Sequence, residues 1–573
     1  EPDCNSPTAE SLVRQCLYGQ QTYKRMFGKT VNNAWLPDVF GNSWILPQIL
    51  KKSGVDYFVS NKMSTWNDTN RFPHNNFIWK GIDGTSVLAC VPPTHFITWN
   101  MPSQIQENWE AYIDKDSGGQ TMNMFGYGDG GSGCTEEMIE LMHRFDKLSI
   151  MPKCEHMGGQ EFLEKNLKNN DSLQTWDGEL YLEMHRGTFT TKSNMKRANR
   201  RLEYKLRDAE ILSVLRGEDN KKTITDAYNK LLINQFHDIL PGSHIHPVYE
   251  DAMKDYAEIE KTVDSLIGTG SKYFNTLNFK RDALTFVPNK KGTATRYGVK
   301  GNWIIPNIPA LSSASLRATK FNDEWLNCNG NNIETPFYKA VLNDDGSIAS
   351  LVDKKQDRQW VDGDFNKLKI YTDCPGNYDA WDILPNYKDK QIEINVSEKL
   401  SLCELDSECA TFKTVLSTDK STWTMLIRFF RRSRGIEVEN IVDWNEKHKL
   451  AKAEFSCNVL TRKALCDTSA GFIERDTHKN TTWQQARFET CHHKWADLSE
   501  TDGGVALIND GKYGIGFDEN TMSLSLLRAT IRPDVTSDMG HHNFSYMIYP
   551  HENGAVEAGV NKLAFQFNEQ LVK

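Results

Sequence analysis

Apolar side chains recur at helical spacing in three stretches near the middle of the chain. Six apolar residues between 195 and 212 are three or four positions apart, and so are six between 248 and 266. The stretch TDAYNKLLINQF (225–236) shows the same spacing. This period predicts amphipathic helices, with Gly217 and Gly268 as the stops of the first and the third. Three such helices with short connections predict a helical bundle.

On either side of these helices the pattern favours short strands. The runs VDYFVSN (55–61), FIWKGI (77–82) and TSVLACV (85–91) alternate with a helical stretch at 11–27. Strands that alternate with helices are typical of an α/β layer or barrel. Further on, YKAVLNDDGSIASLV (338–352) predicts a hairpin that turns at Asp345-Gly346. The short strands TWTMLIRFF (422–430), GIEVENIV (435–442) and GGVALIND (503–510) predict an antiparallel β-sandwich.

The expected fold is therefore multidomain, α/β then α then β. We expect an α/β layer or partial (β/α) barrel over 1–160, a three-helix bundle over 161–270, and the sandwich over 271–573. A length of 573 residues agrees with about three domains.

Composition narrows the class of protein and of partner. Hydrophobic residues make up 39% and charged residues 25%, and no apolar run approaches the roughly 18 residues of a membrane helix. The net charge of -9 argues against nucleic acid as a partner. The 12 cysteines contain no CxxC pair, which fits a reducing compartment. We expect a cytoplasmic protein without a membrane partner, with a vacuolar or lysosome-like location as the alternative.

The stretch WLPDVFGNSWILPQIL (35–50) places Asp38 among aromatic and aliphatic residues. A buried carboxylate is costly unless a cation or a hydrogen-bond donor compensates it. On this stretch alone, the favoured interpretation is that Asp38 caps a helix that runs from Trp44 to Lys52. The alternative is a functional carboxylate whose partner comes from elsewhere in the chain.

Two further stretches contain residues that could take part in chemistry. FGYGDGGSG (125–133) isolates Asp129 among glycines, but it lacks the Lys-Ser/Thr ending of a P-loop. Such a loop can bring a carboxylate close to a bulky ligand, and an ordinary flexible turn is an equal alternative. NQFHDILPGSHIHPVYEDA (234–252) places His237 and Asp238 at a helix end, which suits a metal ligand and its support. A structural histidine is the alternative there.

Five stretches together carry a resemblance to a known family. They are WLPDVFGNSWILPQILKKSGVDYF, RFPHNNFIWKGIDGTSVL, FGYGDGGSG, WDGELYLEMHRGTFTTKSNMKRANRR and NQFHDILPGSHIHPVYEDA, in that order. They resemble glycoside hydrolase family 38, the class II α-mannosidases, and above all its cytosolic/vacuolar and bacterial branch. TTWQQARFETCHHKWADLSE and LSLLRATIRPD resemble the β-rich C-terminal half of that branch. The resemblance covers nearly all of the chain.

The resemblance implies a reaction and a role for each residue of the site. It implies a retaining hydrolysis of terminal α-mannose from oligosaccharides, with the 1–160 region as the catalytic domain. Asp38 is then the nucleophile and a zinc ligand, His237 is a second zinc ligand, and Asp129 is the general acid/base. Asp238 is implied to support the metal ligands or to face the sugar. Retaining enzymes hold their two carboxyl groups about 5–5.5 Å apart, so we expect that separation between Asp38 and Asp129.

Other contacts to the sugar follow more loosely from the resemblance. Trp35 is a candidate for stacking on the sugar, while Phe40 and Trp44 are expected in the core. His185 and Arg186, in LEMHRGT, are expected near the substrate, and a structural arginine is an equal alternative. Zn²⁺ is the implied ion, with Co²⁺ as the alternative, and a homo-oligomer is left open.

One part of the family's pattern is missing from this sequence. The family takes two further zinc ligands from an H-x-D motif upstream of the nucleophile, and none of the 15 histidines is followed by aspartate two positions on. Zinc sites in proteins usually have three or four protein ligands. The favoured interpretation is an N-terminally incomplete fragment of a longer α-mannosidase. The alternative is a catalytically inactive, glycan-binding paralogue.

Overall fold

The computed structural model describes residues 1–573 with the exception of 130–131, 146, 320 and 322, so part of the glycine-rich loop 125–133 lies outside the described residues. The chain divides into two compact units. The first unit comprises Glu1–His185 and Gln235–His237, and the second comprises Arg186–Asn234 and Asp238–Lys573. Among the described helices, none combines the length and the apolar character needed to cross a membrane.

The first unit contains an open, mixed sheet with the strand order β1-β2-β4-β3-β5 in its described part. Its strands are β1 (Asn33–Leu36), β2 (Tyr57–Ser60), β3 (Asn76–Lys80), β4 (Ser86–Cys90) and β5 (Thr175–Asp177). β1 and β4 run parallel to β2, while β3 runs antiparallel to β4 and parallel to β5. The side chains of Phe58, Phe77 and Trp79 are completely buried and form part of the core. The α/β layer is therefore the observed arrangement.

Helices of the first unit are α1 (Ala9–Phe27), α2 (Leu46–Lys52), α3 (Lys62–Thr65), α4 (Pro102–Ala111), α5 (Glu136–Phe145) and α6 (Gly159–Phe162), with short turns at Lys115–Ser117 and Leu163–Leu167. The prediction that Asp38 caps a helix is wrong. α2 begins at Leu46, and the residue before it, Ile45, makes no side-chain cap. Pro47 lies in the first turn of α2, where a missing N–H is tolerated because it has no helical partner in any case.

A short segment far along the chain completes the first unit. The backbone N–H of Asp3 donates to the carbonyl of Gln235 (2.8 Å), and that of His237 donates to the carbonyl of Glu1 (3.1 Å). Pro2 and Phe236 form the bridge between these bonds. This pairing holds His237 in the first unit, although the helices on either side of it belong to the second.

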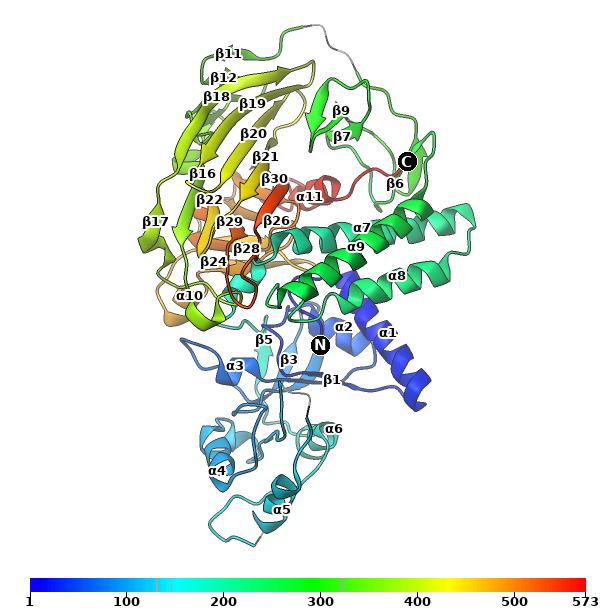
Figure 1. The fold of residues 1–573 in the computed structure, drawn as a ribbon, viewed down its shortest axis with the longest axis vertical. Coiled ribbons are helices and arrows are strands. Elements are labelled where there is room, and N and C mark those ends of the chain that lie inside the picture. Colours follow the sequence, from blue (N-terminus) through cyan, green and yellow to red (C-terminus); the bar gives the residue numbers. More distant parts are fainter. Residues whose placement is uncertain (130–131, 146, 320, 322) are drawn as a thin grey trace. The chain divides into compact units, whose positions relative to one another are not determined.

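The helical bundle of the second unit is confirmed. It consists of α7 (Ser193–Arg216), α8 (Lys221–Ile233) and α9 (His246–Ile267), and each of these helices contacts the other two. α7 and α9 end at Gly217 and Gly268, whose φ angles of 70° and 69° suit glycine. The three helices are the green coils of Figure 1.

The antiparallel β-sandwich of the second unit is also confirmed. Where the chain is described, one sheet has nine strands in the order β18-β19-β20-β21-β30-β27-β26-β23-β24 and another has six in the order β17-β16-β22-β29-β28-β25. Both sheets supply the same core, in which Phe455 of β22 and Tyr546 of β30 lie 5.7 Å apart between ring centroids. The predicted hairpin is β13 paired with β14, with Gly346 at φ 83° in its turn.

The strands of the large sheets, in chain order, are β16 (Val361–Thr372), β17 (Gln391–Ile392), β18 (Asn395–Leu405), β19 (Cys409–Ser417), β20 (Thr422–Phe430), β21 (Ile436–Trp444), β22 (Lys449–Cys457), β23 (Lys463–Asp467), β24 (Phe472–Asp476), β25 (Thr490–Cys491), β26 (Trp495–Ser499), β27 (Gly503–Asn509), β28 (Gly514–Asp518), β29 (Thr521–Arg528) and β30 (Gly540–Glu552). Smaller sheets contain β6 (Tyr273–Asn275), β7 (Thr285–Pro288), β8 (Ala294–Arg296), β9 (Val299–Ile304), β10 (Ser312–Ala314), β11 (Asn327–Asn329), β12 (Asn332–Glu334), β13 (Tyr338–Leu342), β14 (Ile348–Asp353) and β15 (Arg358–Gln359). The remaining helices are α10 (Thr482–Ala486) and α11 (Val560–Asn568), with short turns at Arg186–Phe189, Gly376–Tyr378 and Tyr387–Lys390.

Candidate metal and catalytic centre

Two charged side chains meet where neighbouring parallel strands end. Asp38 lies two residues after β1, and Lys62 lies two residues after β2. The Lys62 ammonium is 2.6 Å from Oδ1 of Asp38, and the two side chains are 11% and 20% exposed. The carboxyl ends of parallel strands share one edge of a sheet, which is where open α/β sheets bind ligands. The sheet itself therefore brings the cation and the carboxylate together.

Asp38 remains ionised although it is largely buried. Burial raises the pKa of its carboxyl group, but the hydrogen bond with His237 and the charge of Lys62 outweigh burial and leave the pKa below its ordinary value. The Lys62 ammonium also lies 4.9 Å from the centroid of the Trp66 ring. Lys62 and His237 are thus the compensation that the apolar surroundings of Asp38 require.

One ring nitrogen of His237 faces Asp38, and the other ring nitrogen faces Glu1. Its Nε2 is 3.3 Å from Oδ2 of Asp38, and its Nδ1 is 3.3 Å from the backbone carbonyl of Glu1. A carbonyl oxygen can only accept, so this contact favours the hydrogen on Nδ1 and the lone pair on Nε2 in the neutral ring. A lone pair opposite a carboxylate oxygen at this distance is favourable only when a proton or a metal cation is shared between them.

Asp238 is joined to His237 by a peptide bond and supplies a third donor. The donor atoms of Asp38, His237 and Asp238 lie within 4.8 Å of one another. Ser243 Oγ donates to Oδ1 of Asp238 at 2.6 Å, which orients that carboxylate. Carboxylate oxygens and an imidazole nitrogen are donors that zinc and other divalent ions accept, and three protein donors suffice for an open zinc site. The residues therefore fit a divalent cation.

Asp129 lies exposed in its loop with a φ angle of 55°. The charge of Asp129 and that of Asp38 both act on the imidazole of His95. Burial and Lys62 lower the pKa of His95, while the charges of Asp129 and Asp38 act to raise it. One imidazole thus lies within electrostatic reach of both carboxylates. The expected separation of Asp38 and Asp129 stays a prediction.

Trp35 and His185 both belong to the first unit. Trp35, on β1, is 39% exposed, and its ring lies so close to Gly159 that a Cβ there would be 2.1 Å from a ring carbon. His185 is 3% exposed with a φ angle of 59°, and its ring is 5.0 Å from that of Phe40 and 5.9 Å from that of Trp66. Trp35 therefore keeps an accessible surface, while His185 is enclosed by aromatic rings.

Arg186 belongs to the second unit and is 1% exposed. Its Nε donates to the carbonyl of Ala486 at 3.0 Å, and its guanidinium lies 4.6 Å from the centroid of the Phe488 ring. These contacts are those of an arginine built into the core of its unit.

Sequence reasoning missed Lys62 and His95. Lys62 has a signal in the chain, because it follows its strand at the same offset at which Asp38 follows the preceding one. His95 lies in the loop after β4, and no spacing connects it with Asp38 or Asp129.

Comparisons with known proteins bear on this arrangement. The Glycosyl hydrolases family 38 N-terminal domain matches residues 1–179, the Alpha mannosidase middle domain matches 183–273, and the Glycosyl hydrolases family 38 C-terminal domain matches 333–536. The three matches follow one another in chain order and cover most of the chain. The class of protein is that of the glycoside hydrolases. The chain belongs to glycoside hydrolase family 38.

Alignments with individual relatives cover all or nearly all of the chain. It is 33% identical to Alpha-mannosidase G of Dictyostelium discoideum over 100% of its own length and 59% of that protein. It is also 33% identical to Alpha-mannosidase 2C1 of Mus musculus (100% and 58%) and to Alpha-mannosidase of Saccharomyces cerevisiae (99% and 54%). The chain thus spans less than two thirds of the length of these curated relatives. The crystal structure of an alpha-mannosidase from Enterococcus faecalis matches 100% of the chain and 80% of its own, with a TM-score of 0.79 and 14% identity, which shows the fold.

Proposed function

We propose that this protein hydrolyses terminal, non-reducing α-D-mannose from oligosaccharides and retains the configuration at the anomeric carbon. The observation that carries the proposal is the state of Asp38. This carboxylate lies at the strand ends of the α/β layer, is kept ionised by Lys62 at 2.6 Å, and still reaches solvent. Relatives named α-mannosidases over the full length of the chain support the choice of sugar.

The proposed reaction has two steps and uses two carboxyl groups. In the first, Asp38 attacks the anomeric carbon while Asp129, protonated, donates its proton to the departing glycosidic oxygen. In the second, water attacks the anomeric carbon of the covalent intermediate, Asp129 takes the proton of the water, and the bond to Asp38 breaks. Lys62 orients Asp38 in both steps and stabilises the carboxylate that is released.

The centre is also proposed to hold a divalent cation, with Zn²⁺ as the ion and Co²⁺ as the alternative. Asp38, His237 and Asp238 would hold it. When bound, such an ion supplies positive charge that orients hydroxyl groups and stabilises the transition state.

Two of the further substrate contacts stay proposals. Trp35 offers an exposed aromatic surface, which suits stacking on a sugar. His185 is proposed to shape the pocket, together with the rings around it. A sugar contact is not proposed for Arg186, because Ala486 and Phe488 occupy its guanidinium.

The test is the hydrolysis of an aryl α-mannoside, with the anomer of the released sugar observed by NMR before mutarotation. We expect α-mannose as the first product, loss of turnover on chelation, and recovery with Zn²⁺ or Co²⁺. β-Mannose as the first product would contradict a nucleophilic Asp38.

The same assay is applied to the chain as given and to the longest reading frame that contains it. Turnover only in the longer protein would mean that the given chain lacks part of the catalytic site. Absence of turnover in both, with retained mannoside binding, would favour the glycan-binding paralogue.

We also propose a cytoplasmic location. The 12 cysteines all lie in described residues and none of them is in a disulfide there, which is usual in a reducing compartment. Fractionation of cells that produce the tagged protein tests this, and recovery with vacuolar or lysosomal markers would contradict it.

A further inference from the structure

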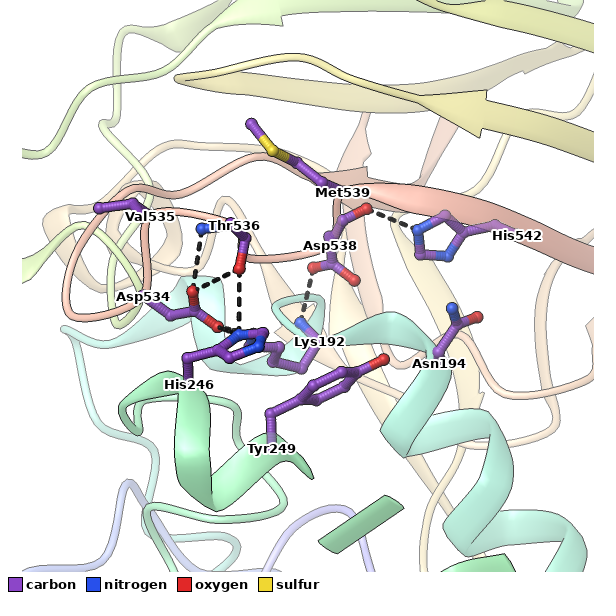
Figure 2. Close-up of a pocket in the computed structure, with 10 residues that line it drawn as sticks. All are labelled: Lys192, Asn194, His246, Tyr249, Asp534, Val535, Thr536, Asp538, Met539 and His542. Carbon is purple, nitrogen blue, oxygen red and sulfur yellow. Dashed lines mark hydrogen bonds and ion pairs between the residues drawn. The ribbon is translucent and has the colours of Figure 1, made fainter. Parts of the chain in front are cut away.

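The second unit contains a cavity of about 480 Å³. It lies where the first turns of α7 and α9 face the loop 534–539, and Figure 2 shows the ten side chains that line it. We call it the α7/α9 pocket. All of its lining residues belong to the second unit. Its volume falls within the range of roughly 300–1,000 Å³ that is usual for small-molecule sites.

Two of the residues that line the α7/α9 pocket, Lys192 and Asp534, form a buried ion pair. Lys192 and Asp534, each with a side chain only 2% exposed, are bonded directly to each other. The same carboxylate accepts from Nδ1 of His246 at 3.1 Å and from the backbone N–H of Thr536 at 2.9 Å. Lys192 is therefore neutralised by a partner whose oxygens are already occupied.

A second carboxylate occupies the start of α7. Asp538 accepts from the backbone N–H groups of Lys192 (2.6 Å) and Ser193 (2.8 Å). A negative charge at this end of a helix is favourable, because the first N–H groups carry partial positive charge. An incoming anion would therefore find the start of α7 already occupied.

His542 brings an acceptor that has no hydrogen-bond partner in the part of the chain that the structure describes. The residue is 2% exposed, and its Nε2 donates to the carbonyl of Asp538 at 2.6 Å. Because a carbonyl only accepts, the hydrogen lies on Nε2, and burial lowers the pKa of the ring so that it is neutral. Its Nδ1 is then a buried acceptor without a hydrogen-bond partner in the described residues. Figure 2 shows this nitrogen turned toward the side of the pocket where Asn194 lies.

Leaving a buried acceptor unsatisfied is unfavourable, so a ligand with a suitably placed hydrogen would be favoured. The charge of the lining excludes several ligand classes. Lys192 stands against two carboxylates, Asp534 and Asp538, so these three side chains together carry one net negative charge, which disfavours anions. A metal ion would have to displace Lys192 or backbone N–H groups from those carboxylates. A neutral hydroxyl group meets neither obstacle.

Other lining residues of the α7/α9 pocket provide apolar surface and an amide group beside these charged residues. Tyr249 and Met539 offer apolar surface, and Asn194 offers an amide whose nitrogen already donates to the carbonyl of His541 at 3.2 Å. A sugar ring combines apolar C–H surface with hydroxyl groups that both donate and accept. Apolar walls beside a few fixed polar groups are the usual composition of a site for such a molecule.

We propose that the α7/α9 pocket binds one neutral hexose, either free or as a unit of an oligosaccharide, with a sugar hydroxyl donating to Nδ1 of His542. The ring of the sugar packs against Tyr249 and Met539, and Asn194 bonds a second hydroxyl. The residues of this site belong wholly to the second unit, so the proposal does not depend on the roles of Asp38 and Asp129.

The test is a titration of the protein with mannose, glucose and galactose, followed by calorimetry or by saturation-transfer NMR. The informative variant is His542→Gln, because the glutamine amide keeps a donor for the carbonyl of Asp538 and removes the acceptor at Nδ1. We expect hexose affinity to fall about tenfold or more, which corresponds to about 1.4 kcal/mol. Turnover of an aryl α-mannoside should stay as in the unchanged protein.

The matched control is His541→Gln, the same substitution one residue earlier on β30. The His541 side chain is 61% exposed and pairs with Asp443 at 3.1 Å, so hexose binding should not change. Methyl α-mannoside and a mannobiose show whether the bound hexose is a free sugar or a unit of an oligosaccharide. Binding of methyl α-mannoside or mannobiose as tight as that of mannose supports a unit of an oligosaccharide, and binding of mannose alone supports the free sugar.

Equal affinity in His542→Gln and in the unchanged protein would overturn the proposal, and so would the absence of saturable binding of any neutral hexose. Thermal unfolding shows whether each variant is folded. If His542→Gln is not folded, Tyr249→Leu replaces it, since removing the aromatic wall should weaken binding by a similar factor.

Discussion

Asp38 of the first unit and Asp534 of the second unit are both largely buried aspartates with a lysine partner, yet their surroundings differ. Asp38 is 20% exposed and has Lys62 on one oxygen and His237 on the other. Asp534 is 2% exposed, and its oxygens are shared among Lys192, His246 and Thr536.

In both cases burial alone raises the pKa of the carboxyl group, and the partners lower it below the ordinary value. A lowered pKa therefore does not distinguish a reactive carboxylate from a structural one. What distinguishes them is whether the carboxylate still reaches solvent, where a substrate can arrive. On that criterion Asp38 is suited to chemistry and Asp534 to holding helix ends in place.

The largest expected effect concerns activity at Asp38. Asp38→Asn should lower kcat/KM on an aryl α-mannoside by at least about 10⁴-fold, because it removes the proposed nucleophile. Its melting temperature should fall less than that of Asp534→Asn, because the Asp38 side chain is the more exposed of the two. A variant that keeps activity within tenfold would overturn the assignment. Asp56→Asn, which removes an exposed partner of Lys51, is the control and should keep full activity.

The reverse effect is expected at Asp534. Asp534→Asn leaves Lys192 buried without its directly bonded counter-charge, so the free energy of unfolding should fall by about 3–5 kcal/mol. Urea unfolding measures this loss. Asp443→Asn, at an exposed pair with His541, should change the stability by less than about 0.5 kcal/mol. If both variants were equally stable, the structural role of Asp534 would have to be abandoned.

A smaller effect, spread over pH, is expected at Lys512. This lysine is 3% exposed and donates to neutral oxygens of Ser193 (2.5 Å) and Leu526 (2.6 Å), in contrast to the paired Lys192. Burial lowers its pKa to about 7. The charged groups that act on it are Asp510, Asp538, Arg197 and Lys196.

Because the folded-state pKa lies below the ordinary 10.5, the unfolded chain binds a proton between these values that the native state does not. The contribution of Lys512 to stability should therefore rise with pH across this window, by up to about 1.4 kcal/mol per pH unit. Lys512→Met should flatten the rise. Urea unfolding of both proteins at several pH values checks this, and parallel profiles would refute it.

The architecture could be predicted well from the sequence because its signals are local. The apolar period of α7 and of α9, together with the glycine that ends each helix, lies within a segment of some twenty residues. The turn of the hairpin at Gly346 is also a local signal. The cap proposed for Asp38 failed because α2 begins at Leu46 with no side-chain cap. Propensity for a cap describes a residue type, whereas the start of the helix is set by how the segment packs.

The candidate site could be predicted only in part from the sequence. Asp38, Asp129 and His237 were named through motifs, but Lys62 and His95 were not. The contact between His237 and Asp38 depends on backbone pairing between residues 1–3 and 235–237, and nothing in either segment indicates its partner. Contacts between residues so far apart in the chain are chosen by the whole fold, so sequence patterns do not reveal them.

Because residues 235–237 pair with residues 1–3, the first unit cannot be completed until residue 237 has been synthesised. The 49 residues from Arg186 to Asn234, which include α7 and α8, are synthesised before His237 appears. At translation rates of about 5–20 residues per second this takes roughly 2–10 s. During that interval the first unit lacks the segment that completes it. The segment that carries His237 can therefore join the first unit only after α7 and α8 have been synthesised.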